Sequence, residues 1–425
     1  MRSNRGLWIF IGLSLISSAC GSSSNDAGSC TTTAFSGTTY ATVGTETNGG
    51  NVVPVTVNGN LCGSNQYPNE VCTSVTICSP TQPTNCQTIN NILVDTGSYG
   101  LRIFSSLITV PLVPITSGGM NLAECVQFGD GSSEWGQIEY AYVQLGSEPA
   151  VGVPIHAINS SYATPPALCS TSQSTPDIGP EETGFNGILG VGLFAQDCVA
   201  SCVQAANNEM YYSCNGSDCS CGATVTLNAQ VQSPVAALPT DNNGLILKLP
   251  SVSSSGVASV SGSLVLGIGT QSNNTPSSVT TYFADQTGSF TTTFTGVYTS
   301  QPMTSSFIDS GSNVLFFPVP AGASLPDCSV SHGSAWQGLY CPFSLQSFQA
   351  NNLGGTGGGT VSFQVENAFS LINSGLMVFN NLAGNGSNSS ISYFDWGLPF
   401  FFGRNVYVGI DGTTSSLGTG PYWAY

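Results

Sequence analysis

The sequence predicts a mainly β protein made of two similar lobes. Only 6% of its 425 residues are charged and 51 are glycine, so the chain lacks the lysine and glutamate of long surface helices and is rich in turn residues. A length of 425 residues also exceeds what one hydrophobic core usually spans. The third observation is a repeat, because an apolar run, Asp-Thr/Ser-Gly-Ser and a second apolar run occupy residues 92–104 and again 306–317.

The N-terminal region predicts export from the cytoplasm. Two arginines precede an apolar run over residues 7–16, and small residues follow before Cys20. This pattern is typical of a secretory signal over residues 1–19. The apolar run is too short for a membrane-spanning helix, and the residues on either side of it do not suit one. The ending ISSACG resembles a bacterial lipobox, in which cleavage leaves Cys20 as a lipid-modified N-terminus. We therefore expect an exported lipoprotein at the outer membrane or cell surface, with plain secretion as the alternative.

Composition along the chain indicates where the domains begin and end. Residues 20–47 are small and polar, which is typical of a tether. Strand-like segments follow, and a Ser/Gly-rich stretch over residues 251–261 separates two of them. The sequence thus predicts an N-terminal lobe over 48–250 and a C-terminal lobe over 251–425. The irregular Cys-rich stretch at 198–221 is predicted to be an insertion that is cross-linked by disulfides.

The cysteines predict disulfides rather than a metal site. There are 15 cysteines, and setting Cys20 aside leaves an even number in an exported chain. Local spacing favours three pairs: Cys62 with Cys72, Cys78 with Cys86, and Cys328 with Cys341. The group formed by Cys198, Cys202, Cys214, Cys219 and Cys221 raises the alternative of zinc. No histidine accompanies this group and the compartment is oxidising, so we expect neither a metal nor a cofactor.

The charge balance excludes some partners. The chain carries 22 acidic and 5 basic residues, and removal of the signal would leave only Arg102, Lys248 and Arg404 as cations. Such an acidic surface repels nucleic acid and anionic lipid headgroups. Any attachment to a membrane would therefore depend on the acyl chains at Cys20.

A second pair of motifs supports the duplication. The first Asp turn is followed by Ile188-Leu189-Gly190, and the second by Phe401-Phe402-Gly403. Asp95 lies 95 residues before the first glycine, and Asp309 lies 94 residues before the second. Two motif pairs kept at nearly the same spacing indicate a duplicated lobe.

The two turns carry the chemistry that the sequence predicts. In each, a glycine lets the backbone approach the aspartate, and hydroxyls and amides can fix the orientation of its carboxylate. The supporting residues are Thr96, Gly97, Ser98, Ser310, Gly311 and Ser312. One such turn alone is more often a cap, but two related by a pseudo-twofold axis would bring Asp95 and Asp309 together. They would then share one proton and activate a water for amide hydrolysis.

These motifs resemble those of the pepsin-like aspartic proteases, over residues 48–425 and in the same order. The resemblance implies a bilobal acid-protease fold with the active site in the cleft between the lobes, and catalytic roles for Asp95 and Asp309. It also implies a substrate-covering flap hairpin in QFGDGSSEWG, with Phe128, Gly129, Asp130 and Gly131 at its turn. Segments 187–190 and 401–403 match the strands that pass through each lobe's ψ-shaped loop. The amino-acid sequence around these motifs also resembles that of an uncharacterised bacterial family of exported proteins, domain of unknown function 3443.

Three positions depart from the protease pattern. A flap tyrosine and the tryptophan that it contacts are here Phe128 and Arg102, and Arg404 stands where an aspartate often follows the second glycine. Either each arginine balances a local carboxylate, or Arg102 favours the charged dyad and shifts activity toward neutral pH.

The sequence therefore predicts a monomeric aspartic endopeptidase that acts on extended polypeptide. The alternative is an inactive relative that binds peptides or proteins on the same scaffold. A serine hydrolase is disfavoured because the only histidines are His156 and His332 and no G-x-S-x-G motif is present.

Overall fold

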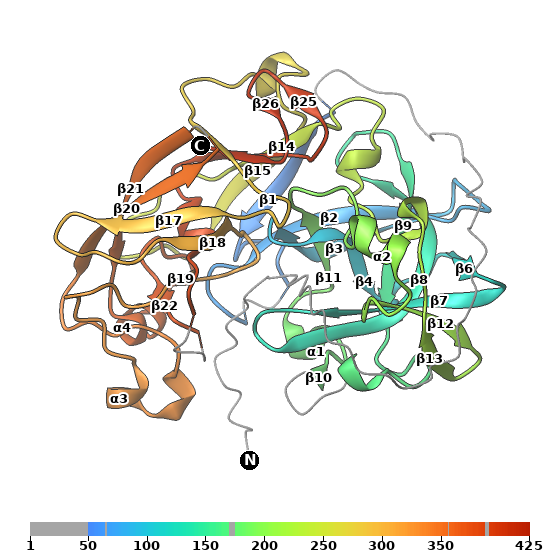
Figure 1. The fold of residues 1–425 in the computed structure, drawn as a ribbon, viewed down its shortest axis with the longest axis horizontal. Helices are drawn as coiled ribbons and strands as arrows, with labels where there is room; N and C mark the ends of the chain where they lie inside the picture. The colour runs from blue at the N-terminus through green and yellow to red at the C-terminus, as the bar shows by residue number, and fades with distance from the viewer. Residues whose placement is uncertain (1–49, 64–65, 170–174, 356, 387–390) are drawn as a thin grey trace.

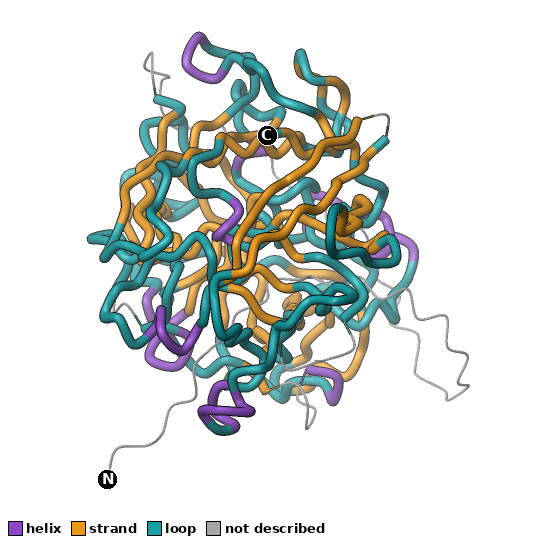
Figure 2. The backbone as a smooth tube through the Cα atoms, turned by 90° about the vertical axis from the view of Figure 1, so that its left-hand side faces the viewer, coloured by secondary structure: helices purple, strands orange, loops and turns teal. Residues whose placement is uncertain are grey.

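The computed structural model describes residues 50–63, 66–169, 175–355, 357–386 and 391–425. The signal expected over 1–19, the lipidated Cys20 and the tether over 20–47 lie outside the described residues. Figure 2 shows a chain of strands and loops with only short helices. The prediction of a mainly β protein is confirmed, and two barrel-like sheets form its two lobes (Figure 1).

The first lobe contains a closed barrel of six strands. Each strand pairs with the next and the last returns to the first, in the order β2 (Val71–Cys78), β3 (Cys86–Asp95), β11 (Gly187–Val191), β4 (Tyr99–Phe104), β9 (Val151–Ile158) and β8 (Ser132–Gln144). All of β4 and β11 and the end of β3 are buried. This burial explains why these segments are apolar except at Asn91, Asp95 and Arg102, since a strand covered on both faces needs no polar alternation.

The second lobe contains a nearly closed sheet of seven strands. Its order is β21 (Gly357–Val365), β20 (Gln346–Gly354), β17 (Phe290–Thr295), β18 (Met303–Ile308), β23 (Asp395–Trp396), β19 (Leu315–Phe316) and β22 (Ala383–Gly384). Strands β21 and β22 are the two ends of this order, so the sheet has a seam between them.

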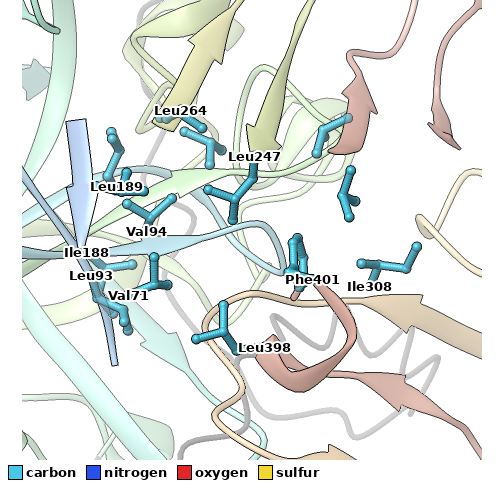
Figure 3. Packing of buried hydrophobic residues seen from close by; sticks show 14 of the residues in the cluster. Val71, Leu93, Val94, Ile188, Leu189, Leu247, Leu264, Ile308, Leu398 and Phe401 are labelled. Carbon is cyan, nitrogen blue, oxygen red and sulfur yellow. The ribbon is translucent and has the colours of Figure 1, made fainter. Parts of the chain in front are cut away.

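A third set of strands joins the lobes. Its antiparallel order is β1 (Val52–Val57), β15 (Val260–Leu266), β14 (Gly244–Lys248), β24 (Asn405–Gly409), β27 (Tyr422–Ala424) and β16 (Thr281–Phe283). The lobe boundary expected at residues 250 and 251 lies in the loop between β14 and β15. Figure 3 shows Val94, Leu189, Leu247, Ile308 and Phe401 in one hydrophobic core that continues from one lobe to the other.

The remaining elements are short. The other strands are β5 (Val113–Pro114), β6 (Thr116–Ser117), β7 (Met120–Gln127), β10 (Thr175–Pro176), β12 (Tyr211–Asn215), β13 (Asp218–Gly222), β25 (Thr414–Ser415) and β26 (Gly418–Thr419). The α-helices are α1 (Pro180–Thr183), α2 (Val199–Gln204), α3 (Ser329–His332) and α4 (Ala368–Ile372). The 3-10 turns are η1 (Ser105–Leu107), η2 (Ala167–Cys169), η3 (Leu227–Ala229), η4 (Val235–Ala237), η5 (Ser272–Asn274), η6 (Ser334–Trp336) and η7 (Leu398–Phe400). Within the described part of the chain, no helix has the length and apolar character needed to cross a membrane.

Six disulfides stabilise the described chain. The three predicted pairs, Cys62–Cys72, Cys78–Cys86 and Cys328–Cys341, are confirmed. Three more pairs were not predicted individually: Cys125–Cys169, Cys198–Cys202 and Cys214–Cys219. The last two lie in the Cys-rich insertion. So many disulfides indicate that the protein folds outside the cytoplasm.

The strand pairing corrects one sequence prediction. In the first lobe Gly190 lies opposite Asp95, because β11 runs parallel to β3. In the second lobe β23 runs parallel to β18 and Trp396 lies opposite Ile308. Gly397, directly after Trp396, is therefore the counterpart of Gly190. The expected counterpart at residues 401–403 was wrong, since that segment follows η7.

Both counterpart glycines are required by close packing. A Cβ at Gly190 would lie 2.6 Å from the backbone nitrogen of Tyr99, and one at Gly397 would lie 2.0 Å from the carbonyl oxygen of Val314. Each clash is with backbone of the same lobe's Asp turn, so the glycine lets the strand pass directly beside it.

Replacing Gly397 should therefore destabilise the fold. We expect Gly397→Ala to lower the free energy of unfolding by about 1–3 kcal/mol, because the methyl group would overlap backbone that cannot move aside. Gly179→Ala is the matched control, since a Cβ there meets nothing within 4 Å and should change stability by less than about 0.5 kcal/mol. Urea titration of both variants measures the difference, and equal stability would contradict the corrected alignment of the lobes.

Candidate active site

The two Asp turns meet through reciprocal hydrogen bonds. The hydroxyl of Thr96 donates to the carbonyl of Ile308 (3.0 Å) and accepts from the backbone N–H of Ser310 (2.9 Å). In return, the hydroxyl of Ser310 donates to the carbonyl of Val94 (2.7 Å) and accepts from the N–H of Thr96 (3.1 Å). These four buried bonds relate the turns by an approximate twofold axis, as the repeat predicted.

The same pair of contacts orients each carboxylate. The turn glycine donates its N–H to one oxygen and the following serine donates its hydroxyl to the other: Gly97 N to Asp95 Oδ1 (2.8 Å), Ser98 Oγ to Asp95 Oδ2, Gly311 N to Asp309 Oδ1 (2.7 Å), and Ser312 Oγ to Asp309 Oδ2 (2.9 Å). All six supporting residues predicted from the sequence therefore contact the aspartates or lock the two turns together.

The two carboxyl groups face one another beside Gly311. A Cβ at this glycine would lie 2.6 Å from Asp95 Oδ1 and 3.1 Å from Asp309 Oδ1. Both aspartates are buried, at 1% and 0% exposure. Burial raises the pKa of Asp309, and the negative charges of Asp95 and Asp395 and a hydrogen bond with Asp95 raise it further. The pair therefore retains a proton at pH values where an isolated aspartate would lose it.

A third buried carboxylate, Asp395, lies behind the dyad and was missed by the sequence analysis. Ser312 Oγ lies 2.6 Å from Asp395 Oδ2 and 2.9 Å from Asp309 Oδ2. One hydroxyl proton serves only one of these bonds, so the other requires a protonated carboxyl group. Burial raises the pKa of Asp395, the hydrogen bond from Ser312 opposes the shift, and the charge of Asp95 adds to it.

Asp395 also makes the two halves of the site unequal. It lies opposite Phe307 on β18, as Ile188 lies opposite Leu93 on β3. The first lobe thus has an apolar side chain where the second has an acid. The available signal was an aspartate within the otherwise apolar and aromatic segment YFDWGLPFF.

The expected flap is a hairpin turn between β7 and β8. The N–H of Gly131 donates to the carbonyl of Phe128 (3.0 Å), and the N–H of Phe128 donates to the carbonyl of Ser132 (3.0 Å). Asp130 accepts the N–H of Ser132 (2.8 Å), and Gly129 completes the turn. In Figure 1 this hairpin extends from the first lobe toward the centre of the molecule. Phe128 packs against the main hydrophobic core, so it supplies apolar contact but no hydroxyl.

Arg102 joins both strands of this hairpin to β4, the strand that follows the first Asp turn. Its guanidinium lies 2.7 Å from Glu124 on β7, 2.9 Å from Asp197, and 3.6 Å from Glu134 on β8. All four side chains are at most 1% exposed. The expectation that this arginine balances local carboxylates is therefore confirmed. The hairpin is held by ion pairs to both of its strands within four residues of the turn, where the protease pattern holds it by a tyrosine at the tip.

One more titratable group, His156, belongs to the Arg102 cluster, and both it and Glu134 have shifted pKa values. His156 on β9 lies 3.7 Å from Glu124, and burial followed by the charge of Arg102 lowers its pKa. Burial also raises the pKa of Glu134 to about 8, although the charge of Arg102 opposes the shift. At neutral pH, therefore, the histidine is uncharged and Glu134 is largely protonated, which lowers the excess of negative charge around the guanidinium.

Arg404 is not arranged like Arg102. Its guanidinium carbon lies 4.5 Å above the ring of Phe400, and it donates to the carbonyl of the same residue. Among the described residues no carboxylate lies within 4 Å of it. The expectation that it balances a local acid was wrong, and it does not contact the dyad.

One group of possible metal ligands occurs in the described chain. Cys62, Glu70 and Cys72 offer ligand atoms within 4.8 Å of one another. The two sulfurs are joined in a disulfide, so neither is the thiolate that metal binding needs.

Comparison with known proteins gives a family for the whole described chain. Residues 47–425 match a family described as "Protein of unknown function (DUF3443)". No curated protein matches the sequence.

Removal of Arg102 should be far more damaging than removal of another cation. Arg102→Met would leave Glu124 and Asp197 buried without the positive charge that they contact, so we expect a loss of about 3–5 kcal/mol in the free energy of unfolding. Lys248→Met is the control, because Lys248 contacts only a carbonyl oxygen at the surface and should cost less than about 0.5 kcal/mol. Denaturant unfolding at pH 6 provides the measurement. A loss no larger than that of the control would mean that the cluster does not hold the hairpin.

Proposed function

Because the chain belongs to the DUF3443 family of proteins of unknown function, its chemistry must be inferred from its site, and we propose that it is an aspartic endopeptidase of pepsin-like architecture. The observation that carries the proposal is the reciprocal bonding of Thr96 and Ser310, which holds Asp95 and Asp309 face to face. A pair of turns that served only as caps would not need to meet.

The proposed reaction needs one proton on the dyad. The pKa of Asp309 is raised by burial and by its acidic neighbours, which supports this carboxyl as the protonated member. A water between the two groups gives a proton to the ionised carboxylate as its oxygen attacks the peptide carbonyl carbon. The protonated carboxyl gives its proton to the carbonyl oxygen, so a tetrahedral diol forms. Transfer of a proton to the nitrogen then breaks the C–N bond without a covalent intermediate. The apparent pKa values of this reaction belong to the pair.

The proposed substrate is an extended polypeptide. Such a chain would bind between the lobes by β-type hydrogen bonds, with the β7–β8 hairpin closing over it. The dyad is almost completely buried, so binding requires the covering chain to move. No cofactor or metal takes part in this mechanism.

The proposed setting is the cell exterior. Six disulfides indicate folding outside the cytoplasm. The segment ending at Cys20 resembles a lipoprotein signal, and we propose attachment to the outer membrane through lipid at this residue. The protein would act there as a monomer.

The residues at the expected flap favour a second candidate function. Phe128 has no hydroxyl, and Arg102 lies against three carboxylates, so these two residues do not form the hydrogen bond that steadies the flap in the protease pattern. A peptide-binding lipoprotein without catalysis is therefore the alternative.

Substitution of either aspartate should abolish peptide cleavage. Asp95→Asn and Asp309→Asn each remove a proton acceptor or donor, so we expect cleavage of a peptide library between pH 3 and 7 to fall by at least about 100-fold. Asp411→Asn, an exposed residue, should cleave as the parent does. Cleavage that survives both substitutions would overturn the proposal. No cleavage by the parent at any pH, together with peptide binding, would instead assign the non-catalytic function.

Substitution of Asp395 should change the pH profile. Ionised Asp395 raises the pKa of Asp309, so the neutral Asp395→Asn variant should lose its active, singly protonated dyad at a lower pH. We expect the alkaline limb of kcat/KM to move down by roughly 0.5–1 pH unit, with activity near pH 4 retained because Asp395 is protonated there in the parent. A full pH profile of both proteins tests this. An unchanged or upward-shifted limb would show that Asp395 does not act on the dyad.

A further inference from the structure

The second lobe contains a cavity that is separate from the dyad. Its volume is about 700 Å³, which lies within the range of pockets that hold small organic ligands. Its walls come from the end of β17, from β20 and β21, and from residues 396–404. The cavity thus lies against the end of the seven-stranded sheet that is formed by β17, β20 and β21. Neither Asp95, Asp309 nor Asp395 lines it.

Aromatic rings make up much of the wall. Phe348, Phe363, Trp396, Phe400 and Phe402 all contribute to the lining. Four of them are at most 6% exposed, so these rings belong to the hydrophobic core and form a rigid surface. An apolar or aromatic ligand body would lose its contact with water against them.

An exposed apolar side chain marks the turn after β17. Val297 lines the cavity and is 88% exposed. Exposure of a single valine is common at protein surfaces, but here it adds to an aromatic wall. A ligand with an apolar part would cover this side chain as well.

Arg404 gives the cavity its charge. It is the one cation among the described lining residues, and that lining includes no aspartate or glutamate. The whole chain carries 22 acidic and 5 basic residues, so the charge at this cavity is opposite in sign to that of the molecule. Within the described chain the guanidinium of Arg404 contacts the ring and the carbonyl of Phe400, so further N–H groups are available to bind an anion. A planar guanidinium suits a carboxylate or sulfonate, to which it can donate two parallel hydrogen bonds.

We propose that this cavity binds a small amphiphilic anion, whose carboxylate or sulfonate head contacts Arg404 and whose apolar body lies against the aromatic wall. The two other cations discussed above do not offer such a site. Arg102 is enclosed by three carboxylates, and Lys248 donates to the carbonyl of Asn273. The proposal does not depend on the endopeptidase function.

Titration with 8-anilinonaphthalene-1-sulfonate, followed by its fluorescence, tests the proposal. Dodecanoate should displace this probe, whereas dodecan-1-ol, which has no charge, should displace it at least about 10-fold less effectively. Arg404→Gln should weaken binding of both anions by at least about 10-fold. Lys248→Gln removes a cation outside the cavity and should bind within twofold of the parent.

A second variant tests the cavity itself. Ser362 lies on the lining and is exposed, so Ser362→Trp can fill the space without disturbing the core and should abolish saturable binding. It also keeps the test decisive if Arg404→Gln fails to fold. Asp309→Asn should bind the probe as the parent does, which separates this result from any result on peptide cleavage. Parent-like affinity in Ser362→Trp, or equal displacement by dodecanoate and dodecan-1-ol, would overturn the proposal.

Discussion

The reciprocal bonds of Thr96 and Ser310 are the constraint on which the rest of the site depends. Each hydroxyl both donates to and accepts from the backbone of the other lobe. A typical buried hydrogen bond contributes only about 1 kcal/mol net, but leaving such groups unpaired costs more. The turns can therefore satisfy their buried polar groups only when the lobes meet in this register. That register fixes the two carboxyl groups beside Gly311.

The scarcity of cations explains why Asp309 and Asp395 favour their protonated forms. Every ion pair between an arginine and an acid in the described chain is made by Arg102, with Glu124, Glu134 and Asp197. Asp309 and Asp395 have no such partner among the described residues, and burial raises the pKa of both. With no positive charge nearby, protonation is the available way to reduce the repulsion between these carboxyl groups.

The sequence was sufficient for features encoded within short segments, but not for those that depend on strand register. The two Asp turns, the hairpin at residues 128–131 and three disulfides follow from local patterns. Gly397 was missed because β23 has only two residues. The aromatic run after Gly397 also has the sequence pattern of an apolar strand followed by glycine. The partners of Arg102 were missed because Glu124, Glu134 and Asp197 come from three separate segments. Nothing in their own neighbourhoods indicates that they face one arginine.

The inequality of the lobes bears on the proposed mechanism. Two carboxyl groups in identical surroundings would hold a shared proton equally. Here Ile188 leaves the first lobe apolar at the position where Asp395 supplies a carboxyl group to the second. Ser312 joins Asp395 to Asp309, and its single hydroxyl proton requires a further proton on one of them. A proton on Asp309 meets this requirement, and in the mechanism that we propose Asp95 is the carboxylate that accepts the proton of the attacking water.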